Sequence, residues 1–362
     1  YNMVKNLFET VDLGGVICKN RLVRSATFEA GGASRGVITP VLKSIYQDLA
    51  DGGIGAIITG TMCVNQTGAF SRSMVQVQDP AFPAAFSEIA QMLHSKDCRL
   101  IAQINHAGSR TNPKMLPEGM LPLAPSDSEK TQALTVEQIQ EIVHDFGVCA
   151  KICKDAGADA VQLHAAHGYL ASEFLSPYFN RRTDAYGGSI ENRARFLFEI
   201  YDAARAAVGP DYPLWVKINY IDLTDPGMTE EEFQWVCREL SKRGINAIEV
   251  SSGLSETRDS KSFRAVPNEA AEAYNAQAAV DLAEMIDTPI ISVGGYRTPS
   301  IMNKWLNAGK IAAISLSRPL ILDPGLPARW QAGSNEKPKC ISCNKCFTVA
   351  PLGCGAFPKQ AE

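Results

Sequence analysis

Two histidines and a tyrosine lie within six residues of one another, at His164, His167 and Tyr169. Imidazole N–H groups can stabilise an oxygen on which negative charge grows, and a phenol can deliver a proton at neutral pH. A lone histidine more often bonds a nearby backbone carbonyl, but the grouping favours proton transfer or oxyanion support. A metal site would need a carboxylate ligand as well, and the expected strand ends nearby offer none.

A second set of residues could bind a phosphate. Gly294 and Gly295 allow an anion to approach the backbone N–H groups closely, whereas a residue with a side chain would hinder this. Ser317 and Arg318 add a hydroxyl and a guanidinium, which forms charge-assisted bonds to phosphate oxygens. A glycine pair alone is more often a tight turn, but with Arg318 the four residues predict a phosphate site.

Gln103 and Lys217 could bind the rest of such a ligand. The amide can donate to and accept from the edge of a heterocycle, and the cation can stabilise negative charge that develops on it. Together with the phosphate residues they predict a phosphorylated heterocyclic cofactor, for which flavin mononucleotide (FMN) is a fitting example.

These residues follow eight short apolar segments that alternate with segments of helical period. The expected strands are residues 22–27, 55–60, 99–104, 159–163, 214–218, 246–251, 289–293 and 311–316. Continuous apolar runs are typical of parallel strands buried on both faces. Eight strand–helix units without a break in composition predict one α/β domain over residues 1–335, a (β/α)₈ TIM barrel. A doubly wound sheet would need a Gly-x-Gly-x-x-Gly turn, which the sequence lacks.

Two kinds of signal mark the starts of helices. Threonine before proline predicts a capping hydroxyl at Thr39 and at Thr298. Thr135 and Thr229 each precede a Gln or Glu by three residues, which is the spacing of a capping box. In a barrel of this kind the C-terminal ends of the strands carry the chemistry, so the residues named above should meet on one face.

Composition excludes several classes of function. The 362 residues carry 35 Lys and Arg against 39 Asp and Glu, so there is no basic surplus for nucleic acid or an anionic membrane. No apolar run reaches the ~18 residues of a membrane span, and no signal-peptide pattern opens the chain. We therefore expect a soluble, cytoplasmic enzyme with a small-molecule substrate, for which a homo-oligomer is also possible.

Four of the ten cysteines crowd into the tail, residues 336–362. The other six are scattered and are expected to be buried apolar residues. The tail cysteines are separated by two, two and seven residues: Cys340, Cys343, Cys346 and Cys354. This spacing is close to a ferredoxin pattern, and three interpretations stay open: an iron–sulfur cluster, a zinc ion, or an unligated remnant.

Several segments resemble the old yellow enzyme family. The longest comprises HAAHGYL from residue 164 and FLSPYFNRRTDAYGGSIENRARF over 174–196, and KNRLVRSA at 19–26 and QINHAGSR at 103–110 are similar too. The resemblance runs from about residue 5 to residue 330. The tail cysteines point to the NADH:flavin oxidoreductase / 2,4-dienoyl-CoA reductase branch, of which this would be a single-domain member.

The resemblance implies that FMN lies at the barrel top and that the chain is an NAD(P)H-dependent ene reductase acting on α,β-unsaturated carbonyl compounds. It assigns the flavin's reactive edge to Ser25, Ala26 and Thr27 with Gly60 nearby, its pyrimidine edge to Gln103, its N1 and O2 to Lys217, and its phosphate to Gly294, Gly295, Ser317 and Arg318. His164 and His167 would bind the substrate's carbonyl oxygen, and Tyr169 would protonate the substrate.

The sequence departs from the family pattern in two places. Phe28 stands where many relatives have a Cys or Thr that bonds the flavin O4, so the flavin would lack that partner. The tail spacing also differs from that of long relatives, which continue into an FAD domain. Two alternatives remain: an iron–sulfur flavoprotein that passes electrons to a protein partner, and a flavin-free barrel lyase with Lys217 as a Schiff-base nucleophile.

Overall fold

The computed structural model describes residues 4–259 and 261–357. Its centre is a closed ring of eight parallel strands: β3 (Leu22–Arg24), β6 (Ala56–Ile58), β8 (Arg99–Asn105), β11 (Ala160–Ala165), β12 (Leu214–Asn219), β13 (Ala247–Ser251), β14 (Ile290–Val293) and β15 (Ala313–Leu316). The strands follow chain order around the ring, and β15 pairs back with β3. The predicted barrel is confirmed, and each expected strand is present with its ends moved by at most three residues.

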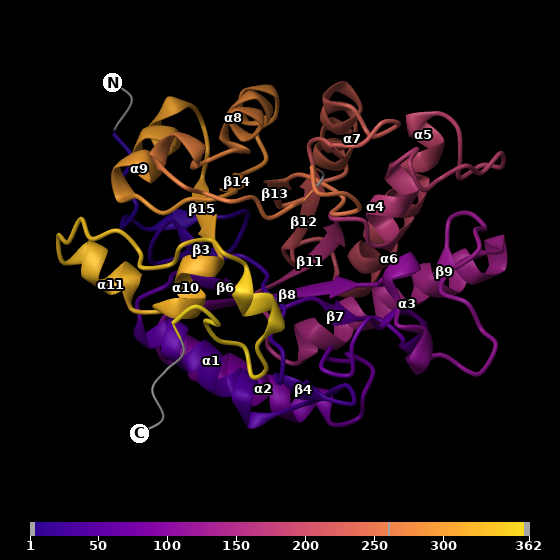
Figure 1. Cartoon of the computed structure of the whole chain (residues 1–362), viewed down its shortest axis with the longest axis horizontal. Coiled ribbons are helices and arrows are strands. Elements are labelled where there is room, and N and C mark those ends of the chain that lie inside the picture. The colour runs from indigo at the N-terminus through magenta and orange to yellow at the C-terminus, as the bar shows by residue number, and fades with distance from the viewer. Residues whose placement is uncertain (1–3, 260, 358–362) are drawn as a thin grey trace.

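Helices surround this ring and bury the outer faces of its strands (Figure 1). They are α1 (Pro40–Asp51), α2 (Phe82–His94), α3 (Val136–Asp155), α4 (Leu170–Leu175), α5 (Ile190–Arg193), α6 (Arg195–Val208), α7 (Glu230–Lys242), α8 (Ala276–Met285), α9 (Pro299–Ala308), α10 (Arg318–Leu322) and α11 (Leu326–Gln331). Because both faces are covered, the strands read as continuous apolar runs. Among the described residues, no helix is both long and apolar enough to cross a membrane.

A short hairpin closes the N-terminal end of the barrel. It consists of β1 (Val11–Asp12) and β2 (Ile17–Cys18), which pair antiparallel. Its buried side chains share one apolar cluster with the fully buried Trp215 of β12 and with residues near the starts of other strands. This end of the barrel is therefore filled, and a ligand site is left to the C-terminal ends of the strands.

Both predicted capping boxes are present. At α3 the Thr135 hydroxyl accepts from the Gln138 backbone N–H at 3.2 Å, and the Gln138 side chain accepts from the Thr135 N–H at 2.9 Å. Thr229 and Glu232 form the same pair of bonds at the start of α7. These two helices thus begin where the spacing of their sequences predicts.

The predicted hydroxyl caps of α1 and α9 are wrong. Thr39 precedes α1 but donates its hydroxyl to the Gly31 carbonyl at 2.6 Å, and its side chain makes no capping bond. Thr298 precedes α9 and donates to the carboxylate of Glu272 at 2.7 Å. For Thr298 the hydrogen bond to a carboxylate is stronger than one to a neutral backbone group. In both cases the hydroxyl bonds a group outside the helix instead of capping it.

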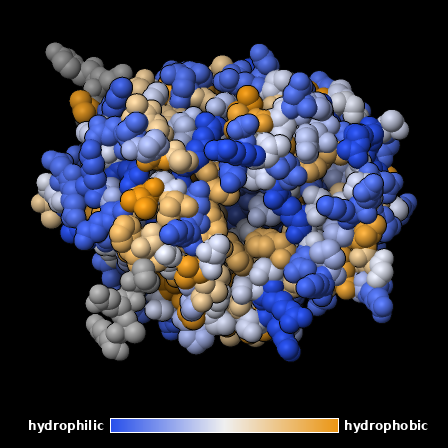
Figure 2. Space-filling view, viewed as in Figure 1, coloured by the Kyte–Doolittle hydropathy of each residue, from blue (hydrophilic) through white to orange (hydrophobic). Residues whose placement is uncertain are grey.

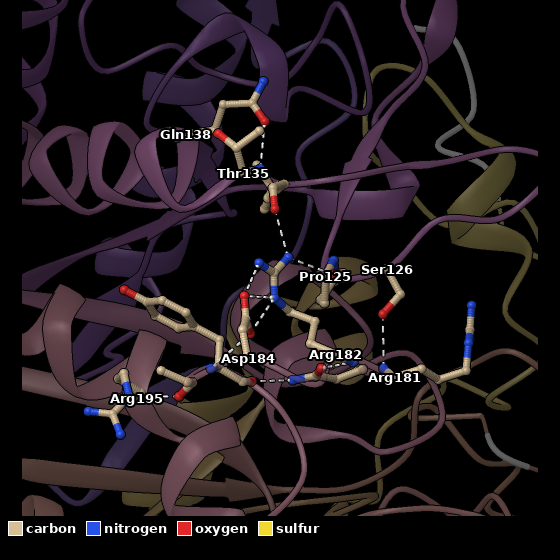
Figure 3. Close-up of polar contacts among 12 residues, drawn as sticks. Pro125, Ser126, Thr135, Gln138, Arg181, Arg182, Asp184 and Arg195 are labelled. Atoms are coloured by element: carbon tan, nitrogen blue, oxygen red, sulfur yellow. Dashed lines mark hydrogen bonds and ion pairs between the residues drawn. The ribbon is translucent and has the colours of Figure 1, made fainter.

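The long family-like segment after α4 holds a loop in place. Arg182 lies between the Asp184 carboxylate, at 2.6 Å, and the carbonyl oxygens of Pro125 and Leu134, at 2.9 and 2.7 Å (Figure 3). The backbone N–H of the preceding arginine bonds Ser126 at 2.9 Å. The segment therefore ties the long connection after β8 to the connection after β11, on the face where the strands end.

The tail runs back over the barrel after α11 and is the yellow part of Figure 1. It contains one 3₁₀ turn, η5 (Lys345–Thr348), and the Leu352 N–H bonds the Ala30 carbonyl at 2.8 Å. A groove lies between this tail, α1 and α10. The surface in the same view is mainly hydrophilic, with a recess near the middle that apolar side chains border (Figure 2).

Candidate functional site

One cavity of about 260 Å³ lies at the C-terminal ends of the strands. It brings together nearly every residue that the sequence singles out: Ser25, Ala26, Thr27, Gln103, His164, His167, Tyr169, Lys217, Gly294, Gly295, Ser317 and Arg318. Gly60 is the exception. It is buried beneath the rim, and its N–H bonds the Glu29 carboxylate at 3.1 Å.

The histidines and Tyr169 form one compact group. The rings of His164 and His167 are perpendicular with centroids 5.4 Å apart, and the Tyr169 ring lies 4.9 Å from His164. His164 is on β11, whereas His167 and Gly168 have the left-handed φ values of 64° and 74°. This conformation is uncommon for a residue with a side chain. It turns the chain sharply enough to bring both imidazoles to one cavity.

Burial keeps both imidazoles neutral. It lowers the pKa of His164 and of His167 well below the usual value, and the positive charges of Lys217 and Arg110 add to the effect. The Nδ1 atom of His164 accepts from the Ala166 N–H at 3.3 Å. A neutral ring that accepts at Nδ1 carries its proton on Nε2, so His164 has an N–H to donate.

His167 and Tyr169 have partners that fix their directions. The Nε2 atom of His167 lies 2.7 Å from the Ser251 hydroxyl. Burial raises the pKa of Tyr169 and the Arg110 guanidinium opposes this, so the phenol keeps its proton at pH 7. Arg110 lies 5.8 Å from the centre of the Tyr169 ring and donates to the Gly168 carbonyl at 3.0 Å. The site therefore contains two neutral imidazoles beside a protonated phenol.

The opposite side of the cavity has the features of a phosphate cradle. Gly294 and Gly295 have φ values of 142° and 74°. A Cβ atom on either would lie 2.8 Å from Asn275 or from the Tyr274 ring, so only glycine fits without a shift. Arg318 lines the same side, where its guanidinium donates to the Asn344 side chain at 2.8 Å and to a loop carbonyl.

Two polar atoms on the cavity wall have no hydrogen-bond partner among the described residues. They are the side-chain oxygens of Gln103 and Thr61, both buried. Buried polar atoms normally find a partner, so these two point to a polar ligand. Unmet acceptors, a glycine cradle and the cations Lys217 and Arg318 fit FMN. Phe28 lines the cavity and packs edge-on against Phe70 at 4.9 Å, and its side chain offers no hydrogen bond.

Sequence reasoning missed several residues of the site. Arg110 ends the QINHAGSR segment and could have been found there, because a cation beside a predicted acid alters its protonation. Glu249 lies beneath the cavity, and a carboxylate inside an otherwise apolar strand was a usable signal. Ser342 and Phe347 of the tail also line the cavity, and no local pattern indicates so distant a contact.

The four tail cysteines share one small pocket with Arg318, Ile321 and Leu322. Within residues 4–259 and 261–357, no three His, Cys, Asp or Glu side chains are grouped to hold a single metal ion. The role of the four tail cysteines therefore stays a prediction. The six scattered cysteines are buried, as expected.

Comparisons with known proteins agree with the fold. The chain is 33% identical over 347 residues to an NADH oxidase of Thermoanaerobacter brockii, covering 94% of this chain and 53% of that protein. It is 31% identical over 329 residues to an NADPH dehydrogenase of Bacillus velezensis, covering 89% of this chain and 93% of that protein. The chain thus spans about half the length of the first of these relatives.

Solved structures extend the comparison. A 2-naphthoyl-CoA reductase in complex with 2-naphthoyl-CoA matches with a TM-score of 0.89 at 26% identity, covering 98% of this chain and 57% of that one. Old yellow enzymes and their homologues share the fold. The sequence model of the NADH:flavin oxidoreductase / NADH oxidase family matches residues 6–337. With the barrel, the cavity and this match over most of its length, the chain belongs to the NADH:flavin oxidoreductase / NADH oxidase family, which includes the old yellow enzymes.

Proposed function

We propose that the barrel binds FMN and uses NAD(P)H to reduce the C=C bond of an α,β-unsaturated carbonyl compound. The observation that carries the proposal is the group of two neutral imidazoles and a protonated phenol, which shares one cavity with the Gly294-Gly295 cradle and Lys217. Neutral N–H donors and an acid are what an enone needs at its oxygen and at its α-carbon.

In this proposal each residue has a separate role. His164 and His167 hold the carbonyl oxygen and stabilise the negative charge that grows on it. Tyr169 gives its proton to the α-carbon and regains one from solvent. Bound FMN supplies the hydride chemistry, by which NAD(P)H becomes NAD(P)⁺ and the β-carbon gains the hydride. One hydride and one proton thus convert the alkene to the saturated carbonyl compound.

The loops around the cavity support a conjugated substrate. Arg110 bonds Gly168 and the Leu254 carbonyl, so it joins the connections after β8, β11 and β13 around the mouth. Phe70 stacks against Tyr169 with centroids 5.8 Å apart, beside Phe28. The related 2-naphthoyl-CoA reductase binds a flat conjugated thioester. A planar conjugated carbonyl compound suits an aromatic wall of this kind.

The visible spectrum of the purified protein tests the proposal. We expect a flavin spectrum that NADH or NADPH bleaches under nitrogen and that 2-cyclohexen-1-one restores. A colourless protein that binds no added FMN would refute it. That result would leave the lyase alternative, which trapping with borohydride would test. In the structure, however, the Lys217 ammonium donates to Ser25 at 2.8 Å and pairs with Glu249, so its nitrogen is already occupied.

A second candidate is electron transfer through an iron–sulfur cluster. The shared pocket of the four tail cysteines favours it, because Arg318 lines both that pocket and the main cavity. Protein purified without oxygen should then contain about four iron and four sulfide per chain, as one four-iron cluster requires. Replacing Cys343 by Ser should remove them. Neither metal nor sulfide in the anaerobic protein would leave the cysteines an unligated remnant.

A further inference from the structure

We propose that Glu249 is a positioning residue beneath the cofactor site. It balances the positive charge of Lys217 and fixes which way the side-chain amides of Gln162 and Gln103 are turned. The inference deepens the function proposed above and rests on its FMN site. Glu249 lies on β13 with no exposed surface and is not among the residues that line the cavity. Its hydrogen-bonding effect on a bound ligand must therefore pass through other side chains, whereas its charge acts through space.

Four side chains contact this carboxylate. Three come from strands β11, β12 and β15, and the fourth follows the end of β3. They are Ser25 at 2.6 Å, Ser315 at 2.8 Å, Gln162 at 3.0 Å and Lys217 at 3.4 Å. A carboxylate buried inside a barrel is costly unless it is paired and fully bonded, and these contacts meet that requirement. Ser25, Ser315 and Lys217 also line the cavity, so one side chain separates the carboxylate from it.

The carboxylate fixes the direction of a chain of amides. Because an ionised carboxylate only accepts hydrogen bonds, Gln162 must turn its NH₂ group to Glu249. The Gln162 oxygen then accepts from the NH₂ group of Gln103 at 2.8 Å. The remaining Gln103 oxygen is left on the cavity wall without a partner among the described residues. Gln103 therefore presents an acceptor, which suits a ligand edge with an N–H, such as the pyrimidine imide of a flavin.

The same carboxylate balances a cation. Lys217 donates to the Ser25 hydroxyl at 2.8 Å, and that hydroxyl donates onward to Glu249 at 2.6 Å. Ser25 thus relays between a buried ammonium and a buried carboxylate. The ion pair offsets the positive potential that Lys217 alone would impose on the cavity. Without the carboxylate, a cofactor that gains negative charge on reduction would be stabilised in its reduced form.

Glu249→Gln in the FMN-loaded protein tests the proposal. A neutral amide keeps the size of the side chain but removes the charge. We expect the ratio of reduced to oxidised flavin, read against a reference dye, to rise about tenfold, which is about 30 mV for a two-electron couple. Binding of FMN to the apoprotein should also weaken, because a glutamine can donate to Gln162 and allow the amide chain to reverse.

Two further variants separate the effects. Gln162→Leu breaks only the amide chain, so it should weaken FMN binding and leave the flavin potential near that of the wild type; it also provides a test if Glu249→Gln does not fold. Glu29→Gln is the matched control, because Glu29 is also buried but bonds Arg24 and Tyr46 rather than this group.

The outcomes are distinct from those of the proposed function. A Glu249→Gln protein with the potential and FMN affinity of the wild type would overturn the inference while leaving ene reduction intact. So would a Gln162→Leu protein that binds FMN as tightly as the wild type, or a Glu29→Gln protein whose potential shifts as far as that of Glu249→Gln. A wild-type chain that binds no FMN would overturn both proposals together.

Discussion

Tyr169 is the residue on which the proposed proton transfer depends. It is the phenol nearest His164, and its raised pKa keeps it protonated. Tyr169→Phe should slow the oxidation of reduced flavin by an enone by about 10²–10⁴-fold, the usual contribution of one general acid. Reduction of the flavin by NAD(P)H should change little. Stopped-flow measurement of both steps tests this, and equal losses in the two would show that Tyr169 only shapes the cavity.

The two histidines should be needed to bind the substrate's carbonyl oxygen but not to bind FMN. The double variant His164→Ala with His167→Ala removes both N–H donors, while the glycine cradle and Lys217 remain. We expect FMN to stay bound and the charge-transfer band with phenols, which mimic the substrate's enolate, to disappear. Titration with 4-hydroxybenzaldehyde measures this. Tight phenol binding by the double variant would contradict the assignment.

His106 should make the stability of the fold depend on pH. Burial lowers its pKa to about 3, below the ~6.5 of an unfolded histidine, so between these values the unfolded chain binds the extra proton. Stability is therefore lost as the pH falls below about 6.5. Relative to His106→Gln, the wild type should lose about 1.6 kcal/mol between pH 6.5 and pH 5. Urea unfolding at both pH values measures the difference, and parallel curves would refute it.

For single residues, the sequence predicted which side chains belong to the candidate site better than it predicted their backbone conformation and position. Spacing alone grouped His164, His167 and Tyr169, because six consecutive residues at the end of one strand cannot lie far apart. It could not predict the left-handed backbone of His167, since nothing local favours that conformation in a histidine. Nor could it place Gly60, whose N–H turns to Glu29, a partner of Tyr46 on α1, rather than to the cavity.

Among the contacts that join secondary-structure elements, those of Arg182 allow a specific prediction of stability. Its guanidinium is mostly buried and bonds Asp184 and two carbonyls of the connection after β8 (Figure 3). Its hydrogen bond also lowers the pKa of Asp184. Arg182→Ala leaves these carbonyls without their donor and should cost about 1–3 kcal/mol of stability.

The loss of stability in Arg182→Ala should appear first in the connection after β8. Amides of residues 122–134 should exchange hydrogen faster in Arg182→Ala, and KM for the enone should rise more than kcat falls. The exposed Lys151, which pairs with Asp155 on α3, provides the control through Lys151→Ala. Unchanged exchange in the loop would mean that the segment is held by its other contacts.

The elements that were predicted correctly are those defined by local physics. Eight apolar runs and two capping boxes need only neighbours in the sequence, and all are present. The caps at Thr39 and Thr298 failed because their hydroxyls found tertiary partners. The network around Glu249 was missed for a related reason, since its five members come from four strands and one strand end that are far apart in the sequence.

At the scale of the whole molecule, the barrel and its tail form one site. Phe347 of the tail packs on Phe263 of the connection after β13 with centroids 4.6 Å apart, and both line the cavity. Arg318 connects the cradle to the cysteine pocket through Asn344. From the sequence, residues 336–362 are predicted to be a tail separate from the barrel, because the composition changes there. In the structure, however, the tail supplies part of the cavity wall.

The fate of solvent hydrogen shows whether the protein reduces an enone with protonation at the α-carbon. NAD(P)H and 2-cyclohexen-1-one are incubated with the protein in D₂O, and the product is examined by NMR. Tyr169 exchanges its proton with solvent, so we expect one deuterium at the α-carbon and protium from NAD(P)H at the β-carbon. Cyclohexanone incubated under the same conditions is the control for exchange. Deuterium from solvent at the β-carbon, or no saturated ketone, would contradict the proposed reduction.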